Sequence, residues 1–88
     1  MDKMLGRFDL DTLRLFLAVA QEKNIARAAD KGHIAASAVS KRINHLEREL
    51  ETSLFRRTST GVALTAAGEM LVHYARSVFA FWIECAAR

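Results

Sequence analysis

Apolar residues recur at helical spacing in the segment SAVSKRINHLEREL, residues 37–50, and no other feature restricts the fold of this chain as strongly. Steps of four, three and four residues separate Val39, Ile43, Leu46 and Leu50. This spacing places the four side chains on one side of an α-helix. The opposite side carries Ser37, Lys41, Asn44, His45 and Arg48. The helix therefore packs by its apolar stripe, and its polar side faces water or a polar, negatively charged partner.

Composition limits the chain to one small domain, because it has 88 residues, of which 51% are hydrophobic. It contains no proline and four glycines, which favours helices over long irregular loops. The formal net charge is +3, and the stretch between Glu51 and Glu69 has no acidic residue, while Arg56 and Arg57 are adjacent. A mild positive excess gathered in one stretch is compatible with a polyanionic partner.

Several other classes of protein are disfavoured. Cys85 is the single cysteine, which excludes an internal disulfide and fits a reducing cytosol. The first residues lack the apolar core of a signal peptide, and charged residues interrupt the apolar segment 70–87, which makes it a poor membrane span. The histidines and the cysteine lack zinc-site spacing, and nothing resembles a nucleophile elbow, a catalytic carboxylate pair or a phosphate loop. We therefore expect a cytoplasmic protein with no enzymatic activity, metal or cofactor.

Two further helices are expected before the quoted segment. Residues 9–24 contain a helical stripe of apolar side chains, and Asn24 is suited to cap a short helix over residues 25–31. The small pair Ala28–Ala29 allows another helix to pack closely against this short helix. We expect Gly32 to take the left-handed conformation that ends it, and Ile34 to fill the core from the turn that follows.

The pattern changes after Leu50. The segment LFRRTSTGVALT, residues 54–65, predicts a two-stranded hairpin with Gly61 in its turn. Thr65 is suited to cap a last helix that begins at Ala66. This helix is apolar almost all round, and a monomer of this size cannot bury so much surface on one terminal helix. The order helix, short helix, tight turn, helix and hairpin is that of a winged helix-turn-helix, whose second motif helix enters the major groove of DNA.

At this point the sequence resembles a known family, the N-terminal DNA-binding domain of the LysR-type transcriptional regulators of bacteria. Four blocks carry the resemblance, in order: LRLFLAVAQEKNIARAA, SAVSKRINHLEREL, LFRRT and LTAAGEMLVHYAR. Together they cover roughly residues 9–80. The resemblance implies a winged helix-turn-helix followed by a long linker helix that pairs with a second copy. It also implies that the wing, residues 57–61, lies along the neighbouring minor groove, and that Leu54, Phe55, Leu64 and the run 66–68 belong to the core.

Five positions depart from the family pattern. Ala36 replaces a glutamine that reads bases, and Thr60 replaces the wing arginine that enters a narrow minor groove. Ala35 replaces the serine or threonine cap of the recognition helix, at a cost of about 1 kcal/mol. Gly32 replaces a core leucine, and Glu51 replaces the glycine that ends the recognition helix. Since none of these changes deletes the phosphate-contacting side, we expect general DNA affinity to survive better than sharp sequence preference.

The prediction is thus a mainly α-helical protein, with a winged helix-turn-helix DNA-binding domain over residues 1–64 and a linker and dimerisation helix over residues 65–88. The residues expected to contact duplex DNA are Ala36, Ser37, Ser40, Lys41, Arg42, His45, Arg48, Arg56, Arg57, Thr58, Ser59 and Thr60. The residues expected to hold a homodimer together are Leu71, Tyr74, Val78, Phe79 and Trp82.

Within this prediction, Ser37 and Ser40 supply the specificity for DNA sequence. The lysine and arginines among these residues supply positive charge, and the wing residues 58–60 contact the DNA backbone. Family members continue into an effector-binding domain, so we expect no small-molecule effector site in this chain. A second class stays open, a helical protein-interaction module that acts through its aromatic C-terminal helix. Binding measured at increasing salt concentration distinguishes the DNA-binding protein from the interaction module, because only DNA binding weakens steeply as salt rises.

Overall fold

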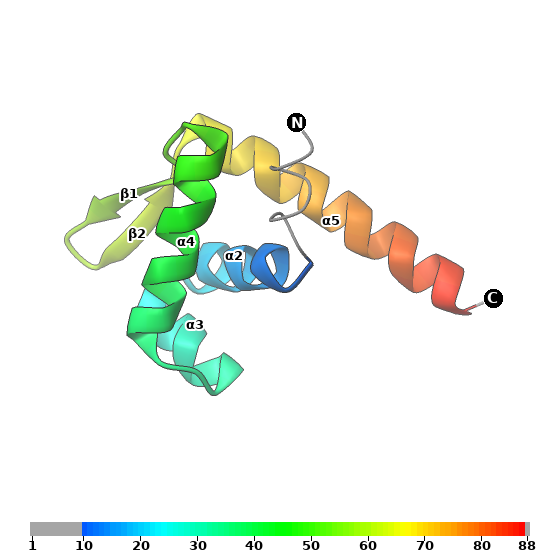
Figure 1. Cartoon of the computed structure of the whole chain (residues 1–88), viewed down its shortest axis with the longest axis horizontal. Coiled ribbons are helices and arrows are strands. Elements are labelled where there is room, and N and C mark those ends of the chain that lie inside the picture. Colours follow the sequence, from blue (N-terminus) through cyan, green and yellow to red (C-terminus); the bar gives the residue numbers. More distant parts are fainter. Residues whose placement is uncertain (1–9, 88) are drawn as a thin grey trace.

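The computed structural model describes residues 10–87 and is mainly helical (Figure 1). Its helices are α2 (Leu10–Glu22), α3 (Ile25–Gly32), α4 (Ala36–Leu50) and α5 (Ala66–Ala87), and its strands are β1 (Phe55–Thr58) and β2 (Gly61–Leu64). This order confirms the predicted winged helix-turn-helix with a long C-terminal helix. Position 9 of the predicted first helix and residues 1–8 of the predicted DNA-binding domain lie outside the described residues.

The core forms where α2, α3 and α4 meet under the hairpin. Phe16, Val19 and Val39 are fully buried, and Ala28 and Ala29 let α3 approach the other two helices closely. The ring of Phe16 lies 5.2 Å from that of Phe55, measured between centroids, which joins the first strand to this core. Burying each large apolar side chain contributes about 1.5–3 kcal/mol, so these contacts hold the helix-turn-helix in one arrangement.

The end of α3 differs from the prediction in two ways. Gly32 is the last residue of the helix, and the left-handed residue is the next one, His33, with φ 57° and ψ 40°. The amide of His33 donates to the carbonyl of Asp30, and the amide of Ile34 donates to that of Ala29, a pairing that defines a Schellman motif. Because the chain reverses one residue later than expected, Ile34 lies on the surface with 40% exposure and does not fill the core.

The hairpin is antiparallel, with Phe55 opposite Leu64 and Thr58 opposite Gly61. Its turn therefore consists of Ser59 and Thr60, and Gly61 is the first residue of β2, whereas the sequence prediction had placed the glycine within the turn. Leu54, just before β1, is fully buried. Phe55 and Leu64 pack partly buried against the core, which confirms the predicted role of these three residues.

Helix α5 begins as predicted. The hydroxyl of Thr65 accepts a hydrogen bond from the amide of Gly68 (3.0 Å) and donates one to the carbonyl of Ser53 (2.6 Å). A Cβ atom on Gly68 would lie 2.1 Å from the carbonyl oxygen of Leu54, so a glycine lets the helix approach the chain before β1. Of the run 66–68, Ala67 packs on the core and Gly68 is buried, while Ala66 is exposed.

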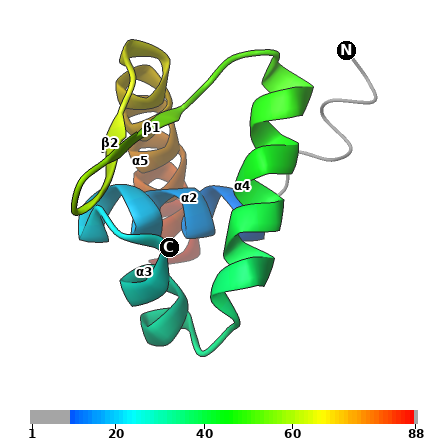
Figure 2. The ribbon, with the colours of Figure 1, turned by 90° about the vertical axis from the view of Figure 1, so that its left-hand side faces the viewer.

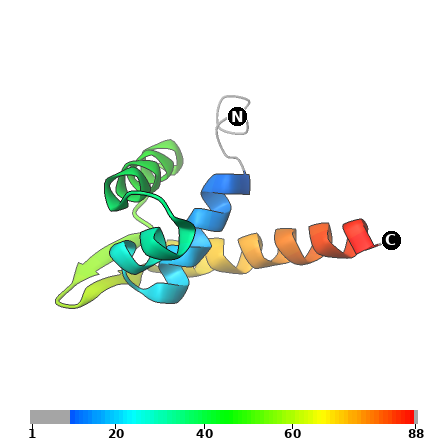
Figure 3. The same cartoon turned by 90° about the horizontal axis from the view of Figure 1, so that it is seen from below.

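Helix α5 runs away from the other elements toward the C-terminus (Figures 1 and 3). Its first turns pack on α2 and β2 through Ala67, Leu71, Val72 and Ala75. Further along, Arg14 of α2 stacks over the ring of Phe79, with its guanidinium carbon 5.7 Å from the ring centroid. Residues 80–86 of α5 extend beyond this contact and are exposed.

Candidate nucleic-acid interface

Helix α4 has the two faces that its sequence predicts. Val39, Ile43 and Leu46 are exposed by at most 3% and pack into the core. On the opposite face, steps of four, three and four residues separate four exposed polar side chains: Ser37, Lys41, Asn44 and Arg48. This polar row is therefore parallel to the buried stripe and available to a partner along the length of the helix.

The predicted contact residues of α4 divide into a central row and two flanks. Ser37, Lys41 and Arg48 belong to the polar row, and His45 lies beside it, 3.6 Å from the Glu49 carboxylate. Ser40 is half-buried on one flank, while Arg42, on the other, lines a cleft of about 350 Å³ between α2 and α3.

Asn44 lies in the centre of the polar row but was left out of the predicted contact residues. Its position between Lys41 and Arg48 at helical spacing was the signal that pointed to it. An amide side chain can donate and accept at once, which suits the N6 and N7 edge of adenine. Of the exposed side chains in this row, Asn44 therefore has the chemistry best suited to hydrogen bonding with a base edge.

Both ends of α4 show the departures noted in the sequence. Ala35 has the extended backbone of an N-cap, with φ −70° and ψ 141°, but its side chain caps nothing. At the other end Glu51 is left-handed, with φ 53° and ψ 38°. Its amide donates to the Arg48 carbonyl and that of Thr52 to the Glu47 carbonyl. A glutamate thus occupies a left-handed position that favours glycine, at the strain cost of a Cβ atom.

The hairpin presents its cations and hydroxyls to solvent. Its exposed residues are the five predicted DNA contacts of this segment: Arg56, Arg57, Thr58, Ser59 and Thr60. The hairpin and α4 lie at the end of the molecule opposite to the C-terminus, on either side of α2 and α3 (Figure 2). A single extended partner can therefore contact both elements.

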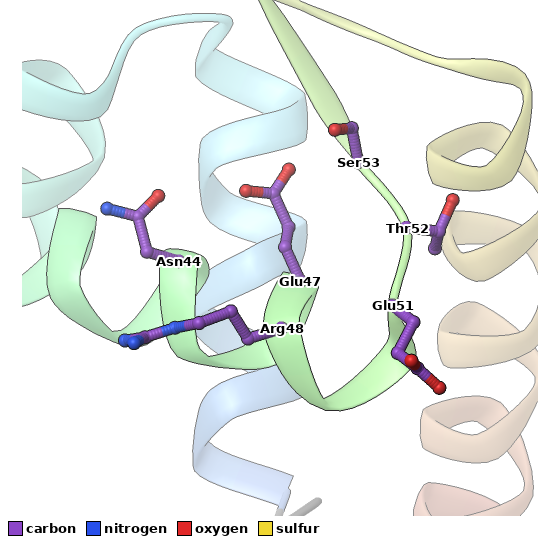
Figure 4. A pocket seen from close by; sticks show the side chains of 6 residues that line it. All are labelled: Asn44, Glu47, Arg48, Glu51, Thr52 and Ser53. Atoms are coloured by element: carbon purple, nitrogen blue, oxygen red, sulfur yellow. The ribbon is translucent and has the colours of Figure 1, made fainter.

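The connection between α4 and the hairpin is bound by a side chain of α4. The Glu47 carboxylate accepts hydrogen bonds from the amides of Leu54 (2.7 Å) and Phe55 (3.2 Å). Its side chain extends from α4 toward the segment at Ser53, beside an open hollow of about 670 Å³ that Asn44 and Arg48 also line (Figure 4). The wing is thus joined to the recognition helix by a carboxylate as well as by the chain.

The family model of the bacterial regulatory helix-turn-helix proteins, lysR family, matches residues 10–69 of this chain. The chain belongs to the lysR family. The match covers α2 to the first turn of α5, which includes the polar row of α4 and the whole wing. The shared elements are thus the helix-turn-helix and hairpin described above.

Relatives within the lysR family agree with this assignment. The chain is 40% identical over 74 residues to the HTH-type transcriptional regulator HdfR of Escherichia coli, a match that covers 84% of this chain and 26% of HdfR. The chain therefore spans about a quarter of the length of the curated relatives it matches.

Two solved lysR-type structures share the fold closely. The crystal structure of the BenM DBD with benA site 1 DNA has a TM-score of 0.85 and 34% identity, and the match covers 90% of this chain and 92% of that one. The CbnR DBD–DNA complex has a TM-score of 0.79 and 30% identity, with coverages of 91% and 99%. The architecture described here is thus that of domains crystallised with DNA.

Two further observations concern the described part of the chain. Within residues 10–87, His, Cys, Asp and Glu side chains form no group of three or more that is placed to hold a metal ion. No helix in that range combines the length and the apolar character that a membrane crossing requires.

Proposed function

We propose that this chain binds duplex DNA, with α4 in the major groove and the β1–β2 hairpin on the adjoining backbone and minor groove, as the DNA-binding part of a transcription regulator. The observation that carries the proposal is the exposed polar row of α4, which lies opposite the buried side chains of Val39, Ile43 and Leu46. A helix fits the major groove, where each base pair presents a distinct pattern of donors and acceptors. Membership of the lysR family and the DNA complexes of BenM and CbnR support it.

The residues of the interface divide into two roles. Ser37, Ser40 and Asn44 are able to read base edges by hydrogen bonds, whereas Ala36 offers only apolar contact. The charge that neutralises phosphates comes from Lys41, Arg42, Arg48, Arg56 and Arg57, with His45 beside them. The hydroxyls of residues 58–60 donate to the backbone from the wing. Because the interface has few base-reading groups and many cations, it binds duplexes of any sequence and discriminates only weakly between sequences.

The test is binding to a mixed pool of duplexes as salt rises, measured by fluorescence anisotropy. The logarithm of the association constant is expected to fall linearly with the logarithm of salt, with a slope of about −0.9 per phosphate contacted. Lys41→Ala weakens all sequences about equally and lowers the magnitude of the slope by about one. The matched control is Arg76→Ala, which removes an exposed cation from α5 and leaves the slope unchanged.

Two results would contradict the proposal in different ways. A chain that binds no duplex at low salt would refute DNA binding. A loss confined to one sequence in Lys41→Ala would leave DNA binding intact but would make Lys41 a base-reading residue.

The proposal includes a homodimer formed through α5. The helix exposes a second apolar row beside the face that packs on the core, at steps of four, four, three and four residues: Met70, Tyr74, Val78, Phe81 and Cys85. Of the residues predicted to form the dimer, Tyr74 and Val78 belong to this row and Trp82 is exposed beside it. Leu71 packs on the core of its own chain, and Phe79 lies under Arg14. Two copies bind two half-sites about one helical turn apart, or a multiple of it.

The remaining parts of the proposal follow from DNA binding. A regulator that binds the chromosome acts in the cytoplasm on the nucleoid, and we propose no catalytic activity, cofactor or small-molecule effector site for this chain. The interaction-module alternative draws on the same exposed row of α5. Such a module ignores duplex and binds its protein partner with little dependence on salt, so the salt titration separates the two functions.

A further inference from the structure

Glu47 holds the connection between α4 and the hairpin through both its backbone and its side chain. Its carbonyl accepts the amide of Thr52 (3.1 Å), and its carboxylate oxygen Oε2 accepts the amides of Leu54 (2.7 Å) and Phe55 (3.2 Å). Three of the four amides from Thr52 to Phe55 are thus bound by one residue. Amides donating to a carboxylate form charge-assisted hydrogen bonds, which are roughly twice as strong as neutral ones.

These bonds fix the direction in which the first strand leaves the helix. Glu47 lies one turn before the end of α4 and is half-buried, with its side chain beside the connection (Figure 4). Phe55 is the first residue of β1, and the next two residues along that strand are the arginines Arg56 and Arg57. The position of both guanidinium groups relative to the polar row of α4 therefore depends on the Phe55 amide being held.

We propose that Glu47 is a positioning residue that sets the wing at the distance and angle from α4 at which both contact DNA together. The role rests on the DNA binding proposed above. A wing that is already held in place binds without the cost of ordering a loop, and its contacts add to those of α4 as an intramolecular event. Without the carboxylate the hairpin keeps its strand pairing and the attachment of Val62 to Lys23, but its first strand loses the hydrogen bonds that set its position against α4.

The test compares Glu47→Ala with Glu47→Gln. Both remove the same negative charge, so both gain the same general attraction for DNA, but glutamine keeps an oxygen that can accept two amides. Each variant is combined with Arg57→Ala, and duplex affinity is measured. In the unmodified chain and in Glu47→Gln, Arg57→Ala is expected to weaken binding about tenfold, as for a charged hydrogen bond. In Glu47→Ala, we expect Arg57→Ala to weaken duplex binding less than about threefold, because the wing is no longer held where Arg57 contacts DNA.

A purely structural role predicts a different result. In that case Glu47→Ala lowers the folded fraction, but Arg57→Ala weakens duplex binding by the same factor whichever residue is at position 47. That result would overturn the proposal. The salt slope gives a second readout, since Glu47→Ala loses the phosphate contacts of the wing while Glu47→Gln keeps them. If Glu47→Ala does not fold, Glu47→Asp replaces it, because aspartate keeps the charge but is one methylene too short for the two amides.

Amide hydrogen exchange tests the hydrogen bonds themselves without DNA. The amides of Leu54 and Phe55 are expected to exchange faster in Glu47→Ala than in Glu47→Gln, while the amide of Val62, bound to the Lys23 carbonyl, keeps its protection. Unchanged protection of Leu54 and Phe55 would overturn the proposal. If the unmodified chain does not bind duplex, the proposed function itself is refuted. If the chain binds duplex and Arg57→Ala weakens binding equally with glutamate, glutamine or alanine at position 47, only the role of Glu47 is refuted.

Discussion

The carbonyl oxygen of Lys23 accepts a hydrogen bond from the amide of Val62 at 3.0 Å. Lys23 lies in the turn between α2 and α3, with φ 57°, and Val62 lies in β2. The second strand of the wing is therefore attached to the helix-turn-helix at a point far from Glu47, which holds the first strand. The two attachments, one on each strand, make the wing a rigid part of the body.

Replacement of Gly61 is expected to break the attachment to Lys23. A Cβ atom at this position would lie 2.1 Å from the Lys23 carbonyl oxygen, so alanine forces the backbones apart. We expect Gly61→Ala to lower the free energy of unfolding by about 2–3 kcal/mol, within the range of strained backbone positions, as measured by urea denaturation. The control is Thr60→Ala in the exposed turn, with an effect within about 0.5 kcal/mol. If the two variants lower the free energy of unfolding equally, the close approach of Gly61 to the Lys23 carbonyl does not restrict which residue can occupy position 61.

Replacement of Glu51 by glycine is expected to stabilise the chain. Glu51 adopts a left-handed conformation, φ 53°, which costs a residue with a Cβ atom roughly 1 kcal/mol relative to glycine. Glu51→Gly should therefore raise the free energy of unfolding by about that amount. Glu51→Gln is the matched control, because it removes the same charge and keeps the strain. Were glutamine to stabilise as much as glycine, charge rather than backbone strain would be the cause.

The helices and their order were predictable because they depend on local patterns. Each of these patterns involves residues within one or two helical turns of one another. They are the apolar stripe of α4 and the two caps formed by Asn24 and Thr65. The Oδ1 atom of Asn24, for example, accepts the amide of Arg27 (3.0 Å). The left-handed residue after α3 was placed wrongly at Gly32. Glycine favours this conformation, but helix length and the packing of α3 made His33 the residue where the chain reverses.

Contacts between distant segments were not predictable from these patterns. The role of Glu47 was not predictable, because nothing in its spacing reveals that its carboxylate accepts the amides of Leu54 and Phe55, seven and eight residues later. Which apolar residues of α5 remain exposed was also only partly predictable. All the apolar side chains of this helix look alike in sequence, and only the packing of Leu71 on the core and of Phe79 under Arg14 shows which side is already covered.

A serine at position 35 is expected to stabilise the recognition helix. Ala35 already has the extended backbone of an N-cap and leaves the first amides of α4 without a side-chain partner from this position. Ala35→Ser places a hydroxyl where it can accept one of these amides, which should raise the free energy of unfolding by about 1 kcal/mol. Ala35→Val is the control that adds side-chain bulk without an acceptor. A valine variant as stable as the serine variant would show that the missing cap costs the chain nothing.

Substitution within the exposed row of α5 is expected to separate the protomers. Tyr74 and Phe81 are exposed by 62% and 68%, and in the proposed dimer they bury aromatic surface that is otherwise in water. Phe81→Glu places a charge in that interface, and we expect dimerisation measured by analytical ultracentrifugation to weaken at least about thirtyfold, as at an interface hot spot. Duplex affinity should fall with it, because two linked half-sites bind more tightly than one.

The matched control for Phe81→Glu is Ala80→Glu, which adds the same charge at an exposed neighbouring position outside the row and should leave the dimer intact. Removal of residues 79–88 should also give monomers that bind DNA much more weakly. If Trp82→Glu separates the protomers and Phe81→Glu does not, the pairing surface is centred on the side of α5 that the sequence predicted. A dimer that survives every one of these changes would place the pairing surface on another element.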